Sequence, residues 1–268
     1  MEIIKIIIYG IIEGITEWLP ISSTGHLIIF EHLLNLPFNE NFMNTFRVII
    51  QFGAILAVIF IYFKKIWPFS NKGKFFIDED IIKMWFKILV ACIPATIIGL
   101  FFDNFFEKLF YNYISVAFAL IIVGIIFVII ENKNFNTNIY SINEINYNMA
   151  LIIGICQAIA AIFPGVSRSG ATIIGAIVLG VSREIAAEFT FFMAIPVMFG
   201  ASLLKLINFG FNFDKKEIIA FIIGLIVSFL TSIVAIKFLI NFIKKHDFKV
   251  FGYYRILIGL IILLLFII

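Results

Sequence analysis

Six apolar stretches set the main constraint on how this chain can fold, because a helix that crosses a lipid bilayer needs about 20 apolar residues. They lie at roughly 43–63, 81–102, 112–131, 185–206, 217–241 and 249–268. Hydrophobic residues make up 62% of the 268 residues and charged residues 14%, which is more apolar surface than a soluble fold of this size could bury. We therefore expect an all-α integral membrane protein with six transmembrane helices.

The composition also excludes other classes of protein. Disordered chains are poor in apolar residues, and a net charge of +3 is too small to indicate a nucleic-acid partner. Cys92 and Cys156 lie in apolar runs without a CxxC motif, so we expect both to be core residues. The apolar N-terminus carries Glu13 and Glu17, which favours a place in the mature fold over a cleaved signal peptide.

Two further apolar regions are interrupted by polar residues. Residues 2–34 break at Pro20, and residues 148–180 break at Pro164. Each half is short for a full crossing, so we expect two re-entrant helix pairs that turn back inside the membrane. Irregular backbone at that depth survives only where protein or a wet cavity satisfies its polar groups, and both breaks are therefore candidate sites. The alternative is two helical hairpins with surface loops.

The two interrupted regions align with each other at an offset of 144 residues. The corresponding pairs are Gly10 with Gly154, Glu13 with Gln157, Pro20 with Pro164, and Ser23 with Ser167. Each region precedes three spans, and because a re-entrant pair adds no net crossing, the second half must lie upside down relative to the first. We expect a single membrane domain with a first repeat at 1–131 and a second, inverted repeat at 147–268. Such inverted repeats are typical of secondary transporters.

The lysine-rich loops at 64–80 and 241–249 predict the orientation. The positive-inside rule places both of them in the cytoplasm. Both termini would then face outward.

Glu13 and Glu17 are four residues apart and point from one helix face. Two carboxylates on one face could hold a divalent cation or divide acid and base roles. The alternative is an interfacial pair that reaches water.

Ser22, Ser23, Thr24 and His26 follow Pro20, where the next short helix should begin. Free amides at a helix N-terminus favour an anion, and a hydroxyl near an imidazole can form a nucleophile and base pair. Taken alone, the hydroxyl run could be a plain N-cap, and His26 could be a core histidine.

The second break, Pro164 to Gly170, indicates a functional site more specifically than the first break does. Its two glycines permit close backbone approach, its two serines offer hydroxyls, and Arg168 supplies a planar fork suited to phosphate oxygens. The partner of Arg168 could be a carboxylate of the first region or a bound anion. Brought together, the two breaks form a constellation suited to phosphoryl transfer.

At this point the chain resembles a known family, the undecaprenyl-diphosphate phosphatases. Glu13-x-x-x-Glu17 with LPISSTGH at 19–26 is similar to one signature, and PGVSRSGAT at 164–172 is similar to the other. The resemblance implies a bacterial cell-wall enzyme that removes the terminal phosphate of a C55 isoprenyl diphosphate and confers bacitracin resistance. It also implies the inner membrane, a site facing outward, bacitracin competing for the substrate, and a possible homodimer.

The resemblance also implies roles for individual residues. Catalytic roles fall to Glu17, Ser23, His26 and Arg168, with the nucleophile open between Ser23 and His26. Glu13 and Glu17 would hold a divalent cation, Mg²⁺ or Ca²⁺. The residues implied to bind substrate are Glu13, Ser22, Thr24, Gln51, Gly165, Ser167, Ser169, Gly170 and Thr172. Arg47 departs from the pattern, because an acidic or neutral residue is expected there.

We compare this function with two alternatives. A secondary transporter or lipid flippase would keep the same fold and use Glu13, Glu17 and Arg168 for binding alone. A phosphatase using two histidines would need a His soon after Arg168, but the next one is His246, so we reject that alternative.

Overall fold

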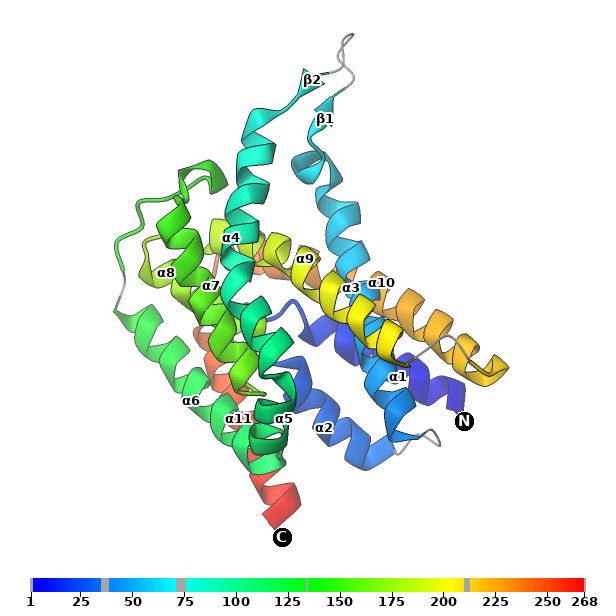
Figure 1. Ribbon diagram of the computed structural model, residues 1–268. Coiled ribbons are helices and arrows are strands. Elements are labelled where there is room, and N and C mark those ends of the chain that lie inside the picture. Colours follow the sequence, from blue (N-terminus) through cyan, green and yellow to red (C-terminus); the bar gives the residue numbers. More distant parts are fainter. Residues whose placement is uncertain (1, 35–38, 71–75, 134, 210–212, 268) are drawn as a thin grey trace.

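The computed structural model is a bundle of helices and describes residues 2–34, 39–70, 76–133, 135–209 and 213–267 (Figure 1). Six of its helices are long and apolar enough to cross a membrane, as predicted. They are α3 (Glu40–Ile66), α4 (Glu79–Phe101), α6 (Tyr113–Asn132), α9 (Arg183–Phe209), α10 (Lys215–Ile243) and α11 (Lys249–Ile267). The protein is therefore a multi-pass membrane protein of the all-α class.

The two interrupted regions form two pairs of short helices, as predicted. The first pair is α1 (Glu2–Thr16) with α2 (Ser23–Leu34), and the second is α7 (Tyr147–Ile162) with α8 (Arg168–Val178). With 11 residues, α8 is about 16 Å long, roughly half the thickness of the hydrocarbon core. Neither α8 nor its three counterparts can cross a membrane alone.

The two halves of the chain exchange their helix contacts. Helix α1 packs along α10, while α7 packs along α4, and the last spans of the halves, α6 and α11, pack against each other (Figure 1). The first short helix of each pair thus packs along the second span of the opposite half. Such an exchange is expected of two internal repeats, and their inversion stays a prediction.

The matched glycines explain how the short helices approach so closely. A Cβ atom on Gly10 would lie 3.0 Å from the carbonyl oxygen of Gly224 in α10. A Cβ atom on Gly154 would lie 2.1 Å from the carbonyl oxygen of Ala91 in α4. Both positions need a residue without a side chain because the partner backbone occupies that space.

Some connections between the spans contain regular structure. The connection at 103–111 holds α5 (Asp103–Phe110), where the ring of Phe110 packs 4.7 Å from that of Phe163. The expected loop at 64–80 carries the short antiparallel strands β1 (Phe69–Ser70) and β2 (Phe76–Ile77). The 131–147 connection contains the 3-10 turn η1 (Ile142–Glu144). The aromatic contact of α5 is a tertiary one, which loop composition does not reveal.

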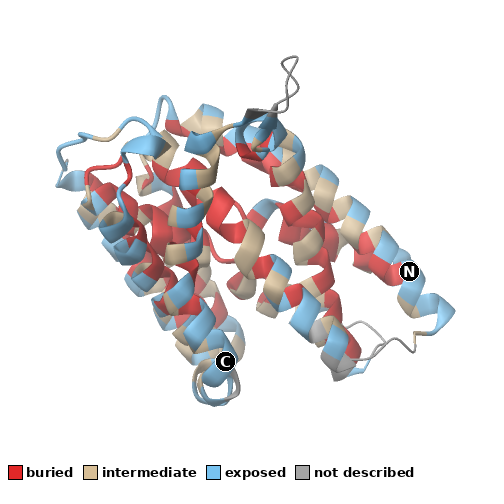
Figure 2. Cartoon of the chain, turned by 45° about the horizontal axis from the view of Figure 1, so that its top comes forward, coloured by how far each residue is buried: buried red, intermediate tan, exposed pale blue. Residues whose placement is uncertain are grey.

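The buried residues gather in the middle of the bundle, while the outward faces of the spans remain exposed and apolar (Figure 2). Phe60, Leu100, Leu230 and Val234 are all more than half exposed. Apolar residues on an outer surface suit lipid as the surrounding solvent. The interior, by contrast, holds most of the polar groups discussed below.

We predict that Gly154→Ala lowers the melting temperature of the protein in detergent, because the new Cβ would overlap the Ala91 carbonyl. Overpacking of this kind costs about 1–3 kcal/mol. Gly200→Ala in α9 is the matched control, since a Cβ there meets nothing within 4 Å. Equal melting temperatures for the two variants would contradict the close α4–α7 contact.

Candidate active site

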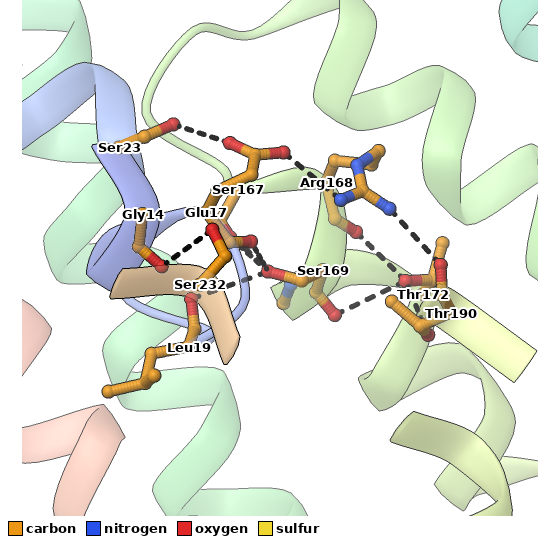
Figure 3. A network of polar contacts seen from close by, with 11 residues as sticks. Gly14, Glu17, Leu19, Ser23, Ser167, Arg168, Ser169, Thr172, Thr190 and Ser232 are labelled. Carbon is orange, nitrogen blue, oxygen red and sulfur yellow. Dashed lines mark hydrogen bonds and ion pairs between the residues drawn. The ribbon is translucent and has the colours of Figure 1, made fainter. Parts of the chain in front are cut away.

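The carboxylate of Glu17 is where the two interrupted regions meet. Ser23 Oγ donates a hydrogen bond of 2.9 Å to Glu17 Oε2, and Arg168 Nη2 donates one of 3.0 Å to Oε1 (Figure 3). Ser23 is the first residue of α2 and Arg168 is the first residue of α8. One carboxylate therefore joins the N-termini of two short helices from opposite halves of the chain.

The residues just before these helices have the same backbone conformation. Ser22 and Ser167 have φ values of 70° and 69°, which is uncommon for residues other than glycine. The amide of Gly25 donates to Ser22 Oγ, and the amide of Gly170 donates to Ser167 Oγ. Both serines therefore cap their helices and hold a strained turn.

This geometry corrects the alignment of the two breaks. The offset of 144 residues pairs Ser23 with Ser167, but the backbone pairs Ser22 with Ser167 and Ser23 with Arg168. The second break has one more residue between its proline and its capping serine, which shifts the offset to 145. The two first-turn residues that contact Glu17 are thus equivalent in position.

Ser169 and Thr172 hold the second break in place. Ser169 Oγ contacts the carbonyl oxygens of Glu17 and Leu19 at 3.2 and 3.4 Å. Thr172 Oγ1 donates to the Arg168 carbonyl at 2.9 Å and accepts from Thr190 Oγ1 at 2.9 Å (Figure 3). Both residues are buried, and their hydroxyl groups are occupied by contacts within the protein.

Arg168 is positioned from three sides. Besides Glu17, its guanidinium donates from Nη1 to the Thr190 carbonyl at 3.1 Å and lies 5.7 Å over the ring of Trp18. Its Nε has no hydrogen-bond partner among the described residues. The group is therefore fixed in place, and its Nε–H is among the donors that it can still offer.

Glu13 lies one turn before Glu17 on α1 and is fully buried. Neither of its carboxylate oxygens has a hydrogen-bond partner in the described part of the chain. A buried carboxylate without a partner is costly, so this position suits a cation. Across the described ranges no three His, Cys, Asp or Glu side chains form a metal cluster, so Glu13 and Glu17 would need further oxygen ligands from water or a phosphate.

His26 is buried and both of its ring nitrogens are engaged. Nδ1 lies 2.7 Å from the Ser22 carbonyl and Nε2 lies 2.8 Å from the hydroxyl of Tyr254, whose ring stacks on the imidazole. Since a carbonyl only accepts, Nδ1 carries a proton, and in the neutral imidazole Nε2 then accepts from the Tyr254 hydroxyl. The Ser23 hydroxyl, meanwhile, is bonded to Glu17.

The remaining predicted residues are less closely tied to Glu17. Thr24 and Gln51 are partly buried on α2 and α3, and neither has a hydrogen bond to the Glu17 network among the described contacts. Gly165 has φ of 97°, and a Cβ there would lie 2.7 Å from the Val116 carbonyl of α6. Its role is thus to let the second break approach α6.

Arg47, the residue that departs from the family pattern, is bonded to Glu31 and Asn44. Its charge is therefore balanced by a carboxylate of α2.

A cavity of about 630 Å³ lies at another end of the bundle, against Glu131 and Arg183. It contains none of the predicted site residues. Glu131 already accepts from Arg183 Nε and from the Phe248 amide, so its carboxylate ties helix ends together instead of offering free ligand atoms.

Sequence reasoning missed Arg255 in α11. Its side chain is fully buried and donates to the carbonyl oxygens of Pro20 at 3.1 Å, Gly165 at 2.8 Å and Val166 at 2.8 Å. One arginine thus ties both breaks together. A charge inside the last apolar span was the signal that could have found it, because such residues are expensive and functional by default.

We predict that Arg255→Met lowers the melting temperature in detergent, because three carbonyl groups of the breaks lose their donor. Each unsatisfied buried group costs about 1–3 kcal/mol. Lys249→Met, at the start of the same helix and partly exposed, is the control and should change little. An unaltered melting temperature in Arg255→Met would show that water replaces the guanidinium.

Comparison with known proteins identifies the family. The family model described as bacitracin resistance protein BacA matches residues 6–261. An undecaprenyl-diphosphatase of Desulfitobacterium hafniense is 56% identical, covering 99% of this chain and 96% of the relative. Undecaprenyl-diphosphatase 1 of Clostridium acetobutylicum is 55% identical, covering 100% and 98%, and an Enterococcus faecalis undecaprenyl-diphosphatase is 48% identical, covering 99% and 97%. A site of this geometry, matched along almost the whole chain, means that this protein belongs to the BacA bacitracin resistance family.

Proposed function

We propose that this protein hydrolyses undecaprenyl diphosphate to undecaprenyl phosphate and phosphate, which returns the lipid carrier to cell-wall synthesis. The observation that carries the proposal is the Glu17 carboxylate, shared between the Ser23 hydroxyl and the Arg168 guanidinium. A hydroxyl held by a carboxylate beside an arginine is an arrangement suited to phosphoryl transfer. The names of the relatives give the substrate.

The diphosphate would be held by cationic and amide donors. Helices α2 and α8 both begin beside the Glu17 carboxylate, because their first residues, Ser23 and Arg168, bond to it. Helix N-termini favour phosphate groups through their free amides and their dipoles. Arg168 adds a planar fork that suits phosphate oxygens. Glu13 and Glu17 would hold a divalent cation, Mg²⁺ or Ca²⁺, which when bound neutralises charge on the phosphates.

Ser23 is the nucleophile that the geometry favours. Its Oγ attacks the terminal phosphorus, the bridging P–O bond breaks, and undecaprenyl phosphate leaves. Glu17, 2.9 Å from Ser23 Oγ, takes the hydroxyl proton. Water then attacks the phosphorus, the bond from phosphorus to the serine oxygen breaks, and Glu17 returns the proton to that oxygen. The released phosphate keeps both protons of the water.

Attack by His26 is the second possibility for the same reaction. The Nε2 lone pair that would attack phosphorus already accepts from Tyr254 at 2.8 Å, so this route requires that bond to break first. The route through Ser23 and Glu17 needs no such rearrangement.

The proposal also places the enzyme in the bacterial inner membrane with its site open to the outer side. The lysines near the ends of α3 and α10 support this orientation through the positive-inside rule. Bacitracin would compete by binding the diphosphate lipid, and the homodimer implied by the resemblance stays part of the proposal.

Phosphate release tests the proposed function. Purified protein in detergent should release phosphate from undecaprenyl diphosphate, lose that activity with a chelator and regain it with Mg²⁺ or Ca²⁺. Glu17→Gln and Arg168→Lys should each reduce kcat/KM by about 10²–10⁴-fold, because proton transfer or charge stabilisation in the transition state is lost. Glu79→Gln, at an exposed position, is the control. No release by folded protein with either metal would favour a transporter or lipid flippase on this fold.

Trapping a phosphoryl-enzyme distinguishes the two nucleophiles. We predict acid-stable phosphate on Ser23 after rapid quenching in acid, with a much larger loss of kcat in Ser23→Ala than in His26→Gln. An acid-labile phosphate that maps to His26 would reverse the assignment. Turnover without any covalent intermediate would indicate direct attack by water.

A further inference from the structure

An apolar groove runs between α4 and α9 on the side of the protein that faces lipid. It has a volume of about 260 Å³ and is lined by α4 from Leu89 to Phe101 and by Pro196 and Val197 of α9. We call it the α4–α9 groove. Ile93 and Ile97 on its wall are about half exposed, so a hydrocarbon chain in the bilayer can reach it from the side.

The inner end of the groove adjoins the candidate active site. Cys92 lines the groove and is itself buried, with its thiol donating to the Met193 carbonyl of α9. Arg168 is also bonded to the Thr190 carbonyl of α9, one turn from Met193. Cys92 at the inner end of the groove and Arg168 therefore contact backbone carbonyls that lie one turn apart on α9.

Two prolines lie inside the helices that form this groove. Pro94 is within α4 and Pro196 is within α9. A proline in a helix interior removes one backbone hydrogen bond and clashes with the preceding turn, which bends the helix. Both prolines lie at the groove, since Pro196 lines it and Pro94 directly follows Cys92 and Ile93 of its wall.

We propose that the α4–α9 groove binds the isoprenyl units closest to the diphosphate of the substrate, an inference that rests on the proposed function. From Cys92 to Phe101 the groove wall rises about 13 Å, which accommodates only the first few units. The rest of the chain stays in the bilayer. An ordinary phospholipid has no reason to prefer this groove, because its phosphate would have to leave the interface to reach Arg168.

Photolabelling of the parent protein tests occupancy directly. The probe is a farnesyl diphosphate analogue with a diazirine on its third isoprene unit. Labelled peptides should map to 89–101 and 193–197, and unlabelled farnesyl diphosphate should compete. Labels spread evenly over the lipid-facing helices would overturn the proposal. So would equal labelling of the groove by a diazirine phosphatidylcholine that farnesyl diphosphate does not displace.

Kinetics with one variant gives a second test. Ile93→Trp fills the groove and should raise KM for farnesyl diphosphate about tenfold, because the buried apolar contact of the chain is lost, with kcat within about twofold of the parent. Dimethylallyl diphosphate, which has a single isoprene unit, should show no such change. Leu230→Trp on α10, where the residue is exposed to a similar extent, is the matched control. Equal changes for both substrates, or for both variants, would contradict the groove.

The outcomes separate this inference from the proposed function. Groove labelling without phosphate release from either substrate would support the groove and reject the phosphatase. Phosphate release without groove labelling would support the phosphatase and reject the groove.

Discussion

Two helices are interrupted inside an apolar bundle, and the backbone groups freed by those interruptions must find partners there. No bulk water is available at that depth to bind them. Arg255 supplies donors to three carbonyl groups from both breaks, and Ser22 and Ser167 cap the helices that follow. The rest of the site depends on these hydrogen bonds, because they set where Ser23 and Arg168 lie relative to Glu17.

The charges at the site follow from the same constraint. Glu17 and Arg168 pair in surroundings where an isolated charge would be costly, while Glu13 keeps a buried carboxylate without a partner in the described residues. A cation and a diphosphate arriving together would supply the ligands that Glu13 lacks and accept the donor that Arg168 still offers. Binding of both would therefore offset part of the cost of burying the Glu13 carboxylate.

The architecture also separates the two ends of the proposed substrate. The diphosphate requires hydrogen-bond donors and positive charge, and the two breaks place Arg168 and two helix N-termini deep within the bundle. The isoprenyl chain requires only apolar surface, which the outer faces of the spans already present to lipid. A groove that runs from Cys92 toward the bilayer allows each end to stay in the surroundings that suit it, and no part of the long chain has to pass through a polar site.

The sequence by itself determined the six spans, the two interrupted regions and most of the residues that gather at Glu17, because apolar length and a proline with polar neighbours are local signals. It did not identify α5, the equivalent positions of Ser23 and Arg168, or the hydrogen bonds of Arg255 to both breaks. It also did not predict the hydrogen bond between His26 and Tyr254, 228 residues away. Only the tertiary structure decided these, because a hydrogen-bond partner in a membrane interior is chosen by which helices pack together, and that choice depends on the whole bundle.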